Sequence, residues 1–284
     1  MAKQYGFIRS FAEKNNDEEI LNTVNINYNV SASTRGIDML LNKYNKKDYQ
    51  TEVIMQTSGD ESVPVLEKSI KEATLALVTD GGLVPKDNPD NLTPHNSSNF
   101  FKYSIKGKDS LEPSDYEVCH QGYNNEFVNG NPNRLLPVDA LRLSVNKGKL
   151  GGLYDYFYTT AGVMTSVENS INIGKSIAKQ LKDDGVDCVM LISTCGTSTR
   201  CGAYILKEIE KLGIPTLQVT ALTRIAEGFN INRILKGYNV NYVFGNPYIS
   251  LESEYEIRTE MVERALGMFG SKLGSGGADT NFEI

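Results

Sequence analysis

The sequence predicts an α/β fold of two doubly wound parallel-sheet lobes that face a cleft, preceded by an N-terminal helical arm. Three observations lead to this prediction. Short β-rich segments alternate with amphipathic helical segments, a pattern typical of parallel sheets with helical crossovers. The segment 187–194, DCVMLIST, is almost wholly apolar, as in a parallel strand with both faces covered. Polar, glycine-containing loops follow two of the strands, one in each half of the chain.

The chain divides into four predicted segments. Residues 1–70 are polar and rich in Asn and Lys, with one helical pattern at 33–47, and we expect an arm that binds a partner. Residues 71–150 form the first α/β lobe, and residues 151–270 form the second lobe with the Cys195 loop. The rest, 271–284, is rich in Gly and Ser, which predicts a flexible tail.

The first lobe begins with a strand at Thr74–Thr79 that runs into Asp-Gly-Gly, a signal for a strand followed by a loop. A long loop with little periodicity follows at 85–105. Loops of this length inside a compact domain are usually functional or disordered. A short strand at 115–119 and a helix that starts near Asp139 complete the lobe.

The second lobe alternates strands and helices more clearly. Ser166 and Gly185 are typical of the start and the end of a helix. The predicted elements, in chain order, are a strand at 153–160, a helix at 166–185, a strand at 187–194, a helix at 202–213, a strand at 214–222 and a helix at 252–269.

The composition argues against several classes of protein. The 284 residues carry a formal net charge of −6 without a basic stripe, which argues against nucleic-acid binding. No apolar run approaches the ~20 residues of a membrane span, and the N-terminus lacks the apolar core of a signal peptide, so we expect a cytoplasmic protein. Four cysteines do not indicate a disulfide framework in a chain of this length. Two histidines without a CxxC or HExxH pattern do not indicate a metal site.

Two loops form the predicted functional region, TDGG at 79–82 and TCGTSTRCG at 194–202. In open parallel sheets, ligands bind outside the carboxyl ends of the strands, at a switch point. We therefore expect the two loops to face each other. The second loop places Cys195 where a strand ends and Cys201 where a helix is expected to begin.

Cys195 is the leading candidate for chemistry. It lies just ahead of a predicted helix N-terminus, where N–H groups and the helix dipole stabilise an anion and can lower the pKa of a thiol. Arg200 would add positive charge, and the hydroxyls of residues 197–199 would add donors. The loop thus predicts a thiolate nucleophile in an anion-binding site. The alternative is a small, inert, buried thiol, which we expect for Cys188 inside the strand.

Other residues have both a structural and a functional interpretation. Asp80 is either a general acid or base or a turn former. His120, beside Cys119, follows a predicted strand and is either a structural histidine or part of a site. Arg134 could bind a carboxylate, and Asp139 could cap a helix; for both residues we expect a structural role.

Several segments carry a resemblance to a known family. They lie in one order, mostly between about Ala73 and Pro247: RGIDMLLNK, ALVTDGGLVPKDNPD, FFKYSIKG, NPNRLLPVDALR, YFYTTAGVMTSV, STCGTSTRCGAYILKEIEKLGIP and GNP. Together they closely resemble the selenoprotein B family of glycine, sarcosine and betaine reductases. That family has selenocysteine at the position of Cys195.

The resemblance implies an oxidoreductase that cleaves the α C–N bond of glycine, sarcosine, betaine or a related small amine. The chalcogen would attack the α-carbon, and an amine would leave. The carboxymethyl group would pass to a small selenoprotein carrier, acetyl phosphate would form on a third component, and thioredoxin would supply electrons. For glycine, a partner subunit with a pyruvoyl group would activate the amine. We expect no cofactor bound by this chain itself, and an oligomeric assembly with those partners.

The resemblance and the loop positions together define the expected site. Cys195 would be the nucleophile, and Cys201 would resolve its oxidised form. Substrate contacts are expected from the two loops and from one histidine: Asp80, Gly81, Gly82, His120, Thr194, Gly196, Thr197, Ser198, Thr199 and Arg200.

This chain departs from the family pattern near the expected site. Ser198 replaces a second cysteine, and HQGYNN at 120–125 replaces His-Gly-Gly-Tyr-Asp. The segment NYVFGNP at 241–247 lacks a family histidine, and an N-terminal lobe of the longer members has no counterpart here. These differences leave the substrate amine and the native chalcogen open.

Two other functions remain as alternatives. A cofactor-independent racemase or lyase would need a second thiol opposite Cys195, for which Cys119 is the candidate. A divergent, non-catalytic subunit would retain the fold as a binding module.

Overall fold

The computed structural model describes residues 29–48, 63–270 and 278–279, and the chain separates into two units, residues 1–57 and 58–284. In the first unit, helix α3 covers Ala32–Tyr44. It begins after Ser31, whose Oγ accepts a hydrogen bond from the backbone N–H of Thr34 at 3.2 Å. The helical pattern predicted at 33–47 is therefore confirmed. Much of the remaining predicted arm lies outside the described residues.

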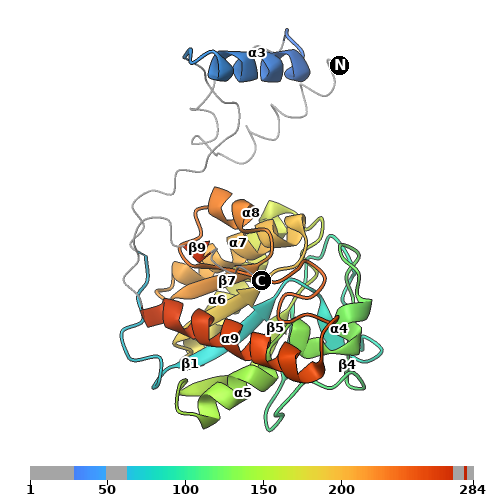
Figure 1. The fold of residues 1–284 in the computed structure, drawn as a ribbon, viewed down its shortest axis with the longest axis vertical. Coiled ribbons are helices and arrows are strands. Elements are labelled where there is room, and N and C mark those ends of the chain that lie inside the picture. Colours follow the sequence, from blue (N-terminus) through green and yellow to red (C-terminus); the bar gives the residue numbers. More distant parts are fainter. Residues whose placement is uncertain (1–28, 49–62, 271–277, 280–284) are drawn as a thin grey trace. The chain divides into compact units, whose positions relative to one another are not determined.

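The second unit is built on a seven-stranded sheet (Figure 1). The strands lie in the order β3-β5-β1-β6-β7-β8-β9, and all are parallel except β3, which is antiparallel to β5. In chain order, the strands of the sheet are β1 (Thr74–Thr79), β3 (Phe101–Ser104), β5 (Gly152–Thr159), β6 (Cys188–Ile192), β7 (Thr216–Thr220), β8 (Ile234–Lys236) and β9 (Ala278–Asp279).

The strand order places a switch point between β1 and β6. After β1 the chain crosses to β5 on one side, and it then returns past β1 to build β6, β7 and β8 on the other side. Ligands in such sheets bind at the carboxyl ends of the strands beside this reversal. A separate two-stranded antiparallel sheet pairs β2 (Leu83–Pro85) with β4 (Tyr116–Val118), directly after the carboxyl end of β1.

Helices cover both faces of the large sheet (Figure 1). Alternate residues of β1 point to opposite faces: Leu75 and Leu77 join one buried cluster, and Ala76 and Val78 join the other. The first cluster contains buried residues of α5 (Val138–Asn146) and α9 (Leu251–Gly270), and the second contains those of α6 (Val167–Asp183), α7 (Gly196–Glu210) and α8 (Thr223–Gly228). Two short elements, α4 (Glu126–Gly130) and a 3₁₀ turn (Pro132–Arg134), connect β4 to α5.

The α/β class and the parallel sheet are confirmed, but the division into two lobes with separate sheets is corrected. Strand β1, assigned by sequence to the first lobe, pairs with β5 and β6 of the second lobe in one sheet. Two further details differ from the prediction. Strand β3 forms inside the predicted loop at 85–105, and β9 forms inside the predicted tail, in parallel with β8.

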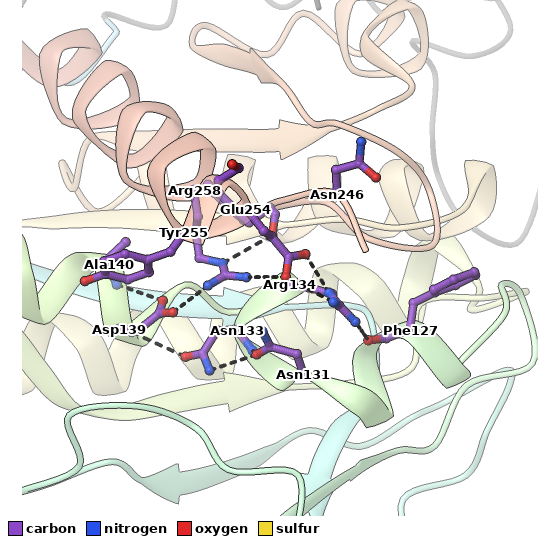
Figure 2. Close-up of polar contacts among 12 residues, drawn as sticks. Phe127, Asn131, Asn133, Arg134, Asp139, Ala140, Asn246, Glu254, Tyr255 and Arg258 are labelled. Carbon is purple, nitrogen blue, oxygen red and sulfur yellow. Dashed lines mark hydrogen bonds and ion pairs between the residues drawn. The ribbon is translucent and has the colours of Figure 1, made fainter. Parts of the chain in front are cut away.

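A buried ionic cluster attaches α9 to the polypeptide around α5 (Figure 2). Arg134 donates two hydrogen bonds to the carboxylate of Glu254, at 2.7 and 3.0 Å. Arg258 donates to Asp139 Oδ2 at 2.6 Å, and its Nη2 lies 3.6 Å from Glu254 Oε2. Asp139 also accepts a hydrogen bond from the backbone N–H of Ala140, in the first turn of α5. The structural interpretation of Arg134 and Asp139 is confirmed by these contacts.

Among the helices of the described ranges, none combines the length and the apolar character that a bilayer crossing requires.

Candidate active site

The two predicted loops come together because their strands are neighbours in the sheet. Thr79, the last residue of β1, is in register with Ile192, the last residue of β6. Asp80 follows the first strand, and the 193–195 turn follows the second. The loops therefore meet at the carboxyl ends of adjacent strands of one sheet, at the switch point.

Cys195 is the N-cap residue of α7, and its side chain is partly exposed. The helix begins at Gly196, six residues before the start that the sequence predicts, because the turn 195–199 is already helical: Thr199 N donates to Cys195 O at 2.8 Å. A consequence is that Cys201 lies inside the helix rather than at its beginning. The dipole and the first N–H groups of α7 favour negative charge near the Cys195 sulfur.

Two hydroxyl groups lie next to the Cys195 sulfur. Ser198 Oγ is 3.4 Å from Sγ, and Thr197 Oγ1 is 3.7 Å from it. The backbone at Gly122 covers the sulfur closely, since a Cβ at this position would be 2.7 Å from Sγ and 2.7 Å from His120 Cε1. This approach therefore requires glycine at position 122.

His120 is buried behind Ser198. Its Nε2 lies 2.8 Å from Ser198 Oγ, and its Nδ1 accepts a hydrogen bond from the backbone N–H of Gly122 at 3.0 Å. Burial lowers the pKa of His120 to about 4, because the imidazolium loses its hydration. The Tyr123 ring packs against the imidazole at a centroid distance of 5.0 Å. Burial raises the pKa of Tyr123, and the charges of Asp80 and Cys195 raise it further.

Asp80 lies beneath the Cys195 turn and is fully buried. Ser193 Oγ donates to its Oδ2 at 2.5 Å, and the backbone N–H of Thr194 donates to its Oδ1 at 3.4 Å. Gln218 of β7 in turn donates to Ser193 Oγ at 2.9 Å. Burial raises the pKa of Asp80 to about 7, although the hydrogen bonds from Ser193 and Thr194 oppose this shift. In this position the Asp80 side chain supports the turn that carries Cys195.

The loop that follows β5 borders the same turn. Met164 N donates to Thr197 Oγ1 at 3.1 Å, and Gly162 N donates to Asp80 O at 2.8 Å. Arg200 donates to the carbonyl of Thr165 at 2.8 Å. The Arg200 Nε is buried without a hydrogen-bond partner among the described residues. Arg200 therefore anchors this loop to α7, and its predicted role as a substrate contact stays a prediction.

For the remaining predicted site residues, the described part of the chain shows contacts with other groups and none with the Cys195 sulfur. Thr199 Oγ1 donates to Cys195 O at 3.0 Å and pairs with Thr220 Oγ1 at 2.9 Å, so it points into the sheet. Thr194 Oγ1 is buried without a hydrogen-bond partner in the described structure. The three predicted glycines contribute only backbone atoms. Gly81 O accepts from Tyr123 OH at 3.0 Å, and Gly82 N donates to Thr160 O at 3.0 Å. Gly196, the first residue of α7, lies close to Ile225.

The other three thiols are placed differently from Cys195. Cys201 is fully buried in the cluster between α6 and α7, and burial raises its pKa to about 12. Cys188 is buried within β6, where burial also raises its pKa. Cys119 Sγ donates to Leu92 O at 3.0 Å and lies 3.5 Å from Asn88 Nδ2, and its pKa is raised by burial. Each of these environments disfavours a thiolate.

Sequence reasoning missed several residues that build the site. Gln218 and Ser193 were available as polar residues within or directly after apolar strands, a pattern that indicates a buried polar contact. Gly122 and Tyr123 lie in the loop that contains His120, and only the fold shows that this loop covers the Cys195 sulfur. Thr165 contributes a main-chain carbonyl, for which the sequence carries no signal.

Comparisons with known proteins identify the family of the chain. The family described as glycine/sarcosine/betaine reductase selenoprotein B matches residues 12–194. A glycine reductase complex component B subunit gamma from Carboxydothermus hydrogenoformans is 41% identical over 232 residues, which cover 82% of this chain and 53% of the relative. From Peptoclostridium acidaminophilum, a betaine reductase complex component B subunit beta is 37% identical over 235 residues, covering 83% of this chain and 54% of the relative.

A sarcosine reductase complex component B subunit beta from the same organism is 37% identical over 234 residues, covering 82% of this chain and 54% of the relative. The chain thus spans about half the length of the curated relatives it matches. No solved structure matches it.

Proposed function

The chain belongs to the glycine/sarcosine/betaine reductase selenoprotein B family, and we propose that it carries the nucleophile of a reductase complex. In this proposal, Cys195 attacks the α-carbon of glycine, sarcosine, betaine or a related small amine. The observation that carries the proposal is the position of Cys195. Its thiol is partly exposed, caps α7 at the switch point of the sheet, and lies beside two hydroxyl groups.

The proposed step is a substitution at carbon. The Cys195 thiolate forms a bond to the α-carbon, the C–N bond breaks, and its electron pair leaves with the nitrogen. The products are a carboxymethyl thioether on Cys195 and the free amine. The carboxymethyl group then passes to the selenolate of a carrier selenoprotein, which frees the Cys195 thiolate without a change of oxidation state. The reduction comes afterwards, when the carbon–selenium bond is cleaved to give an acetyl product: the carrier loses two electrons, and the thioredoxin dithiol restores them. Such a step needs an ionised nucleophile and a fixed substrate, because a thiol attacks poorly and an amine leaves poorly.

The N-terminus of α7 is suited to the carboxylate of such a substrate. Helix N-termini bind anions through N–H groups and the helix dipole. Thr197, with Oγ1 3.7 Å from the Cys195 sulfur, would bring its hydroxyl to a substrate that is aligned for attack. Arg200, which donates to Thr165 O, would act by holding the neighbouring loop in place.

The proposal includes partners. The matched relatives are named as subunits of component B, and this chain spans about half their length. We propose that other chains complete the assembly: a pyruvoyl-type partner that activates the amine of glycine, and a small carrier of the protein A type. No cofactor is proposed for this chain itself. The site lies on a chain that we propose to be cytoplasmic and to act in an oligomer.

Cys201 is a weak candidate for resolving an oxidised Cys195. A buried thiol with a raised pKa supplies little thiolate, so a resolving reaction would require α7 to move. An external dithiol is the more favourable resolving group. The racemase alternative is also weakly supported, because Cys119 Sγ is directed to Leu92 O and Asn88.

The proposal is tested by mass spectrometry of Cys195 peptides. The tagged chain, recovered with the partners that it retains, is incubated with carbon-13-labelled glycine, sarcosine or betaine. We expect a labelled carboxymethyl adduct on Cys195 with at least one amine, and its loss in Cys195→Ser. Cys119→Ser is the matched control and should keep the adduct, whereas a two-thiol racemase would lose its activity in this variant. Absence of an adduct with all three amines would contradict the proposal.

A further inference from the structure

A chain of hydrogen-bonding groups ends at the Cys195 sulfur. It begins at the backbone N–H of Gly122, 3.0 Å from His120 Nδ1. It continues from His120 Nε2 to Ser198 Oγ over 2.8 Å, and from Ser198 Oγ to Cys195 Sγ over 3.4 Å. His120 and Ser198 are both buried, at 2% and 0% exposure, so water does not compete for the contact between them.

The first contact, between Gly122 N–H and His120 Nδ1, fixes the donor-to-acceptor direction of this series of hydrogen bonds. A backbone N–H can only donate, so His120 Nδ1 accepts and carries no proton in this arrangement. A neutral imidazole then has its single proton on Nε2, which donates to Ser198 Oγ. Burial lowers the pKa of His120 to about 4, so the ring is neutral at physiological pH. The geometry selects one tautomer.

Ser198 can follow a change in the charge of the sulfur. While Cys195 is a thiol, its S–H donates to Ser198 Oγ. After deprotonation, the Ser198 hydroxyl can rotate and donate to the thiolate, because its oxygen is still satisfied by His120 Nε2–H. Thr197 resembles Ser198 in this respect: its oxygen accepts from Met164 N at 3.1 Å, which leaves its own proton free to donate to the sulfur 3.7 Å away or to a bound substrate.

We infer that His120 is a positioning residue that acts through Ser198 to present a hydroxyl donor to the Cys195 thiolate, and that it does so as a neutral imidazole. The inference rests on the nucleophilic role proposed for Cys195. It moves His120 and Ser198 from the expected set of substrate contacts to the support of the nucleophile. It also gives a use to the buried Ser198 side chain, because a serine hydroxyl is a stronger donor than a thiol.

Three other titratable groups are close enough to influence the charge state of His120. Tyr123 packs on the imidazole, and its raised pKa keeps it neutral below pH 10. Asp80 at the end of β1 ionises with a pKa of about 7, and the thiolate proposed at Cys195 would carry a second negative charge. Both negative charges would favour an imidazolium, so the neutral state of His120 is set by burial and by the Gly122 contact.

The test measures the pH dependence of alkylation of Cys195 in the full chain. Iodoacetamide is used because it is uncharged, and peptide mass spectrometry separates Cys195 from the other thiols. The variants are Ser198→Ala, His120→Ala and His120→Gln, whose side-chain amide can replace the Nε2–H donor. Ser176→Ala, on the exposed side of α6, is the matched control.

We expect the pH midpoint of Cys195 alkylation to rise by about one unit or more in Ser198→Ala and His120→Ala, since a hydrogen bond to a charged group is lost. His120→Gln and Ser176→Ala should keep a midpoint near that of the wild type. The inference is overturned if Ser198→Ala leaves the midpoint unchanged, or if His120→Gln shifts it as far as His120→Ala. Should His120→Ala fail to fold, the comparison of Ser198→Ala with His120→Gln still decides.

The measurement also separates this inference from the proposed function. Alkylation needs no amine substrate and no partner subunit. A shifted midpoint in a chain that is never carboxymethylated by an amine would overturn the proposed function alone. An unshifted midpoint in a chain that is carboxymethylated on Cys195 would overturn the role of His120 alone.

Discussion

At the scale of single residues, the buried carboxyl group of Asp80 links folding to pH. Its pKa is about 7 in the folded chain, against an ordinary value of 3.8. The folded state therefore binds a proton that the unfolded state releases between these two pH values. The contribution of Asp80 to the free energy of unfolding is therefore most favourable below about pH 4, and it falls as the pH rises toward 7.

The prediction compares the wild type with Asp80→Asn, which cannot ionise. Between pH 5 and pH 8, the wild type should lose about 2 to 3 kcal/mol more of its free energy of unfolding than the variant. Urea denaturation at both pH values measures this difference. The opposite contribution of His120, whose pKa is lowered, is common to both proteins and cancels. If the free energies of unfolding of the two proteins depend on pH in the same way, the pKa of Asp80 is not raised in the folded chain.

The sequence predicts the position of a single residue where the signal is local. Cys195 could be placed between a strand and a helix because an apolar strand pattern ends just before it and a helical pattern follows. The contact between His120 and Ser198 spans 78 positions and depends on the loop after β4 folding over α7, which no local pattern encodes. Asp80 was predicted as a substrate contact beside the Cys195 loop, and its burial beneath Ser193 depends on β1 and β6 being neighbours.

At the scale of elements, helix α7 packs against β6 and β7 and approaches Asp80, which follows β1. Gly202 makes this packing possible, because a Cβ there would be 2.6 Å from Asp80 Oδ2, from Leu191 Cδ2 and from Ser193 Oγ. Two of these three atoms belong to the hydrogen-bond network beneath Cys195. The distance between helix and sheet therefore also sets the geometry of the candidate site.

Gly202→Ala should lower the free energy of unfolding by about 2 to 3 kcal/mol, as is typical of overpacking in a rigid core. The matched control is Gly267→Ala in α9, where an added Cβ meets no atom within 4 Å. That variant should gain up to about 1 kcal/mol from the higher helix propensity of alanine. Urea midpoints of both variants test the prediction. Equal effects in the two variants would contradict the tight packing at Gly202.

Local periodicity was sufficient for most elements of the second half of the chain. The predicted strands at 187–194 and 214–222 contain β6 and β7, and the predicted strand at 153–160 overlaps β5, which begins one residue earlier. The start of α7 was placed too late because the Gly, Thr and Ser residues at 196–199 have low helix propensity, and tertiary packing overrides it. The division into two lobes was wrong because strand order is a tertiary property: nothing in the sequence of β1 shows that it lies between β5 and β6.

At the scale of the whole folded unit, the cluster of Arg134, Asp139, Glu254 and Arg258 joins segments about 120 positions apart (Figure 2). It fixes α9 over one face of the sheet, where residues of α9 such as Met261 and Phe269 belong to the main buried cluster. The side chains of Glu254 and Arg258 are only 2% and 3% exposed. Solvent screening is therefore small, and two positive and two negative charges balance one another.

Glu254→Gln should destabilise the protein by about 3 kcal/mol or more, because it leaves Arg134 and Arg258 buried with one carboxylate between them. The matched control on the same helix is Glu263→Gln. Glu263 pairs with Lys149 at 2.6 Å, but both side chains are well exposed, at 38% and 45%, so its loss should cost less than about 1 kcal/mol. Urea denaturation of both variants at pH 7 tests the contrast. Hydrogen exchange should show increased opening of α9 in Glu254→Gln, and equal stability of the two variants would mean that the buried cluster does not hold α9 to the sheet.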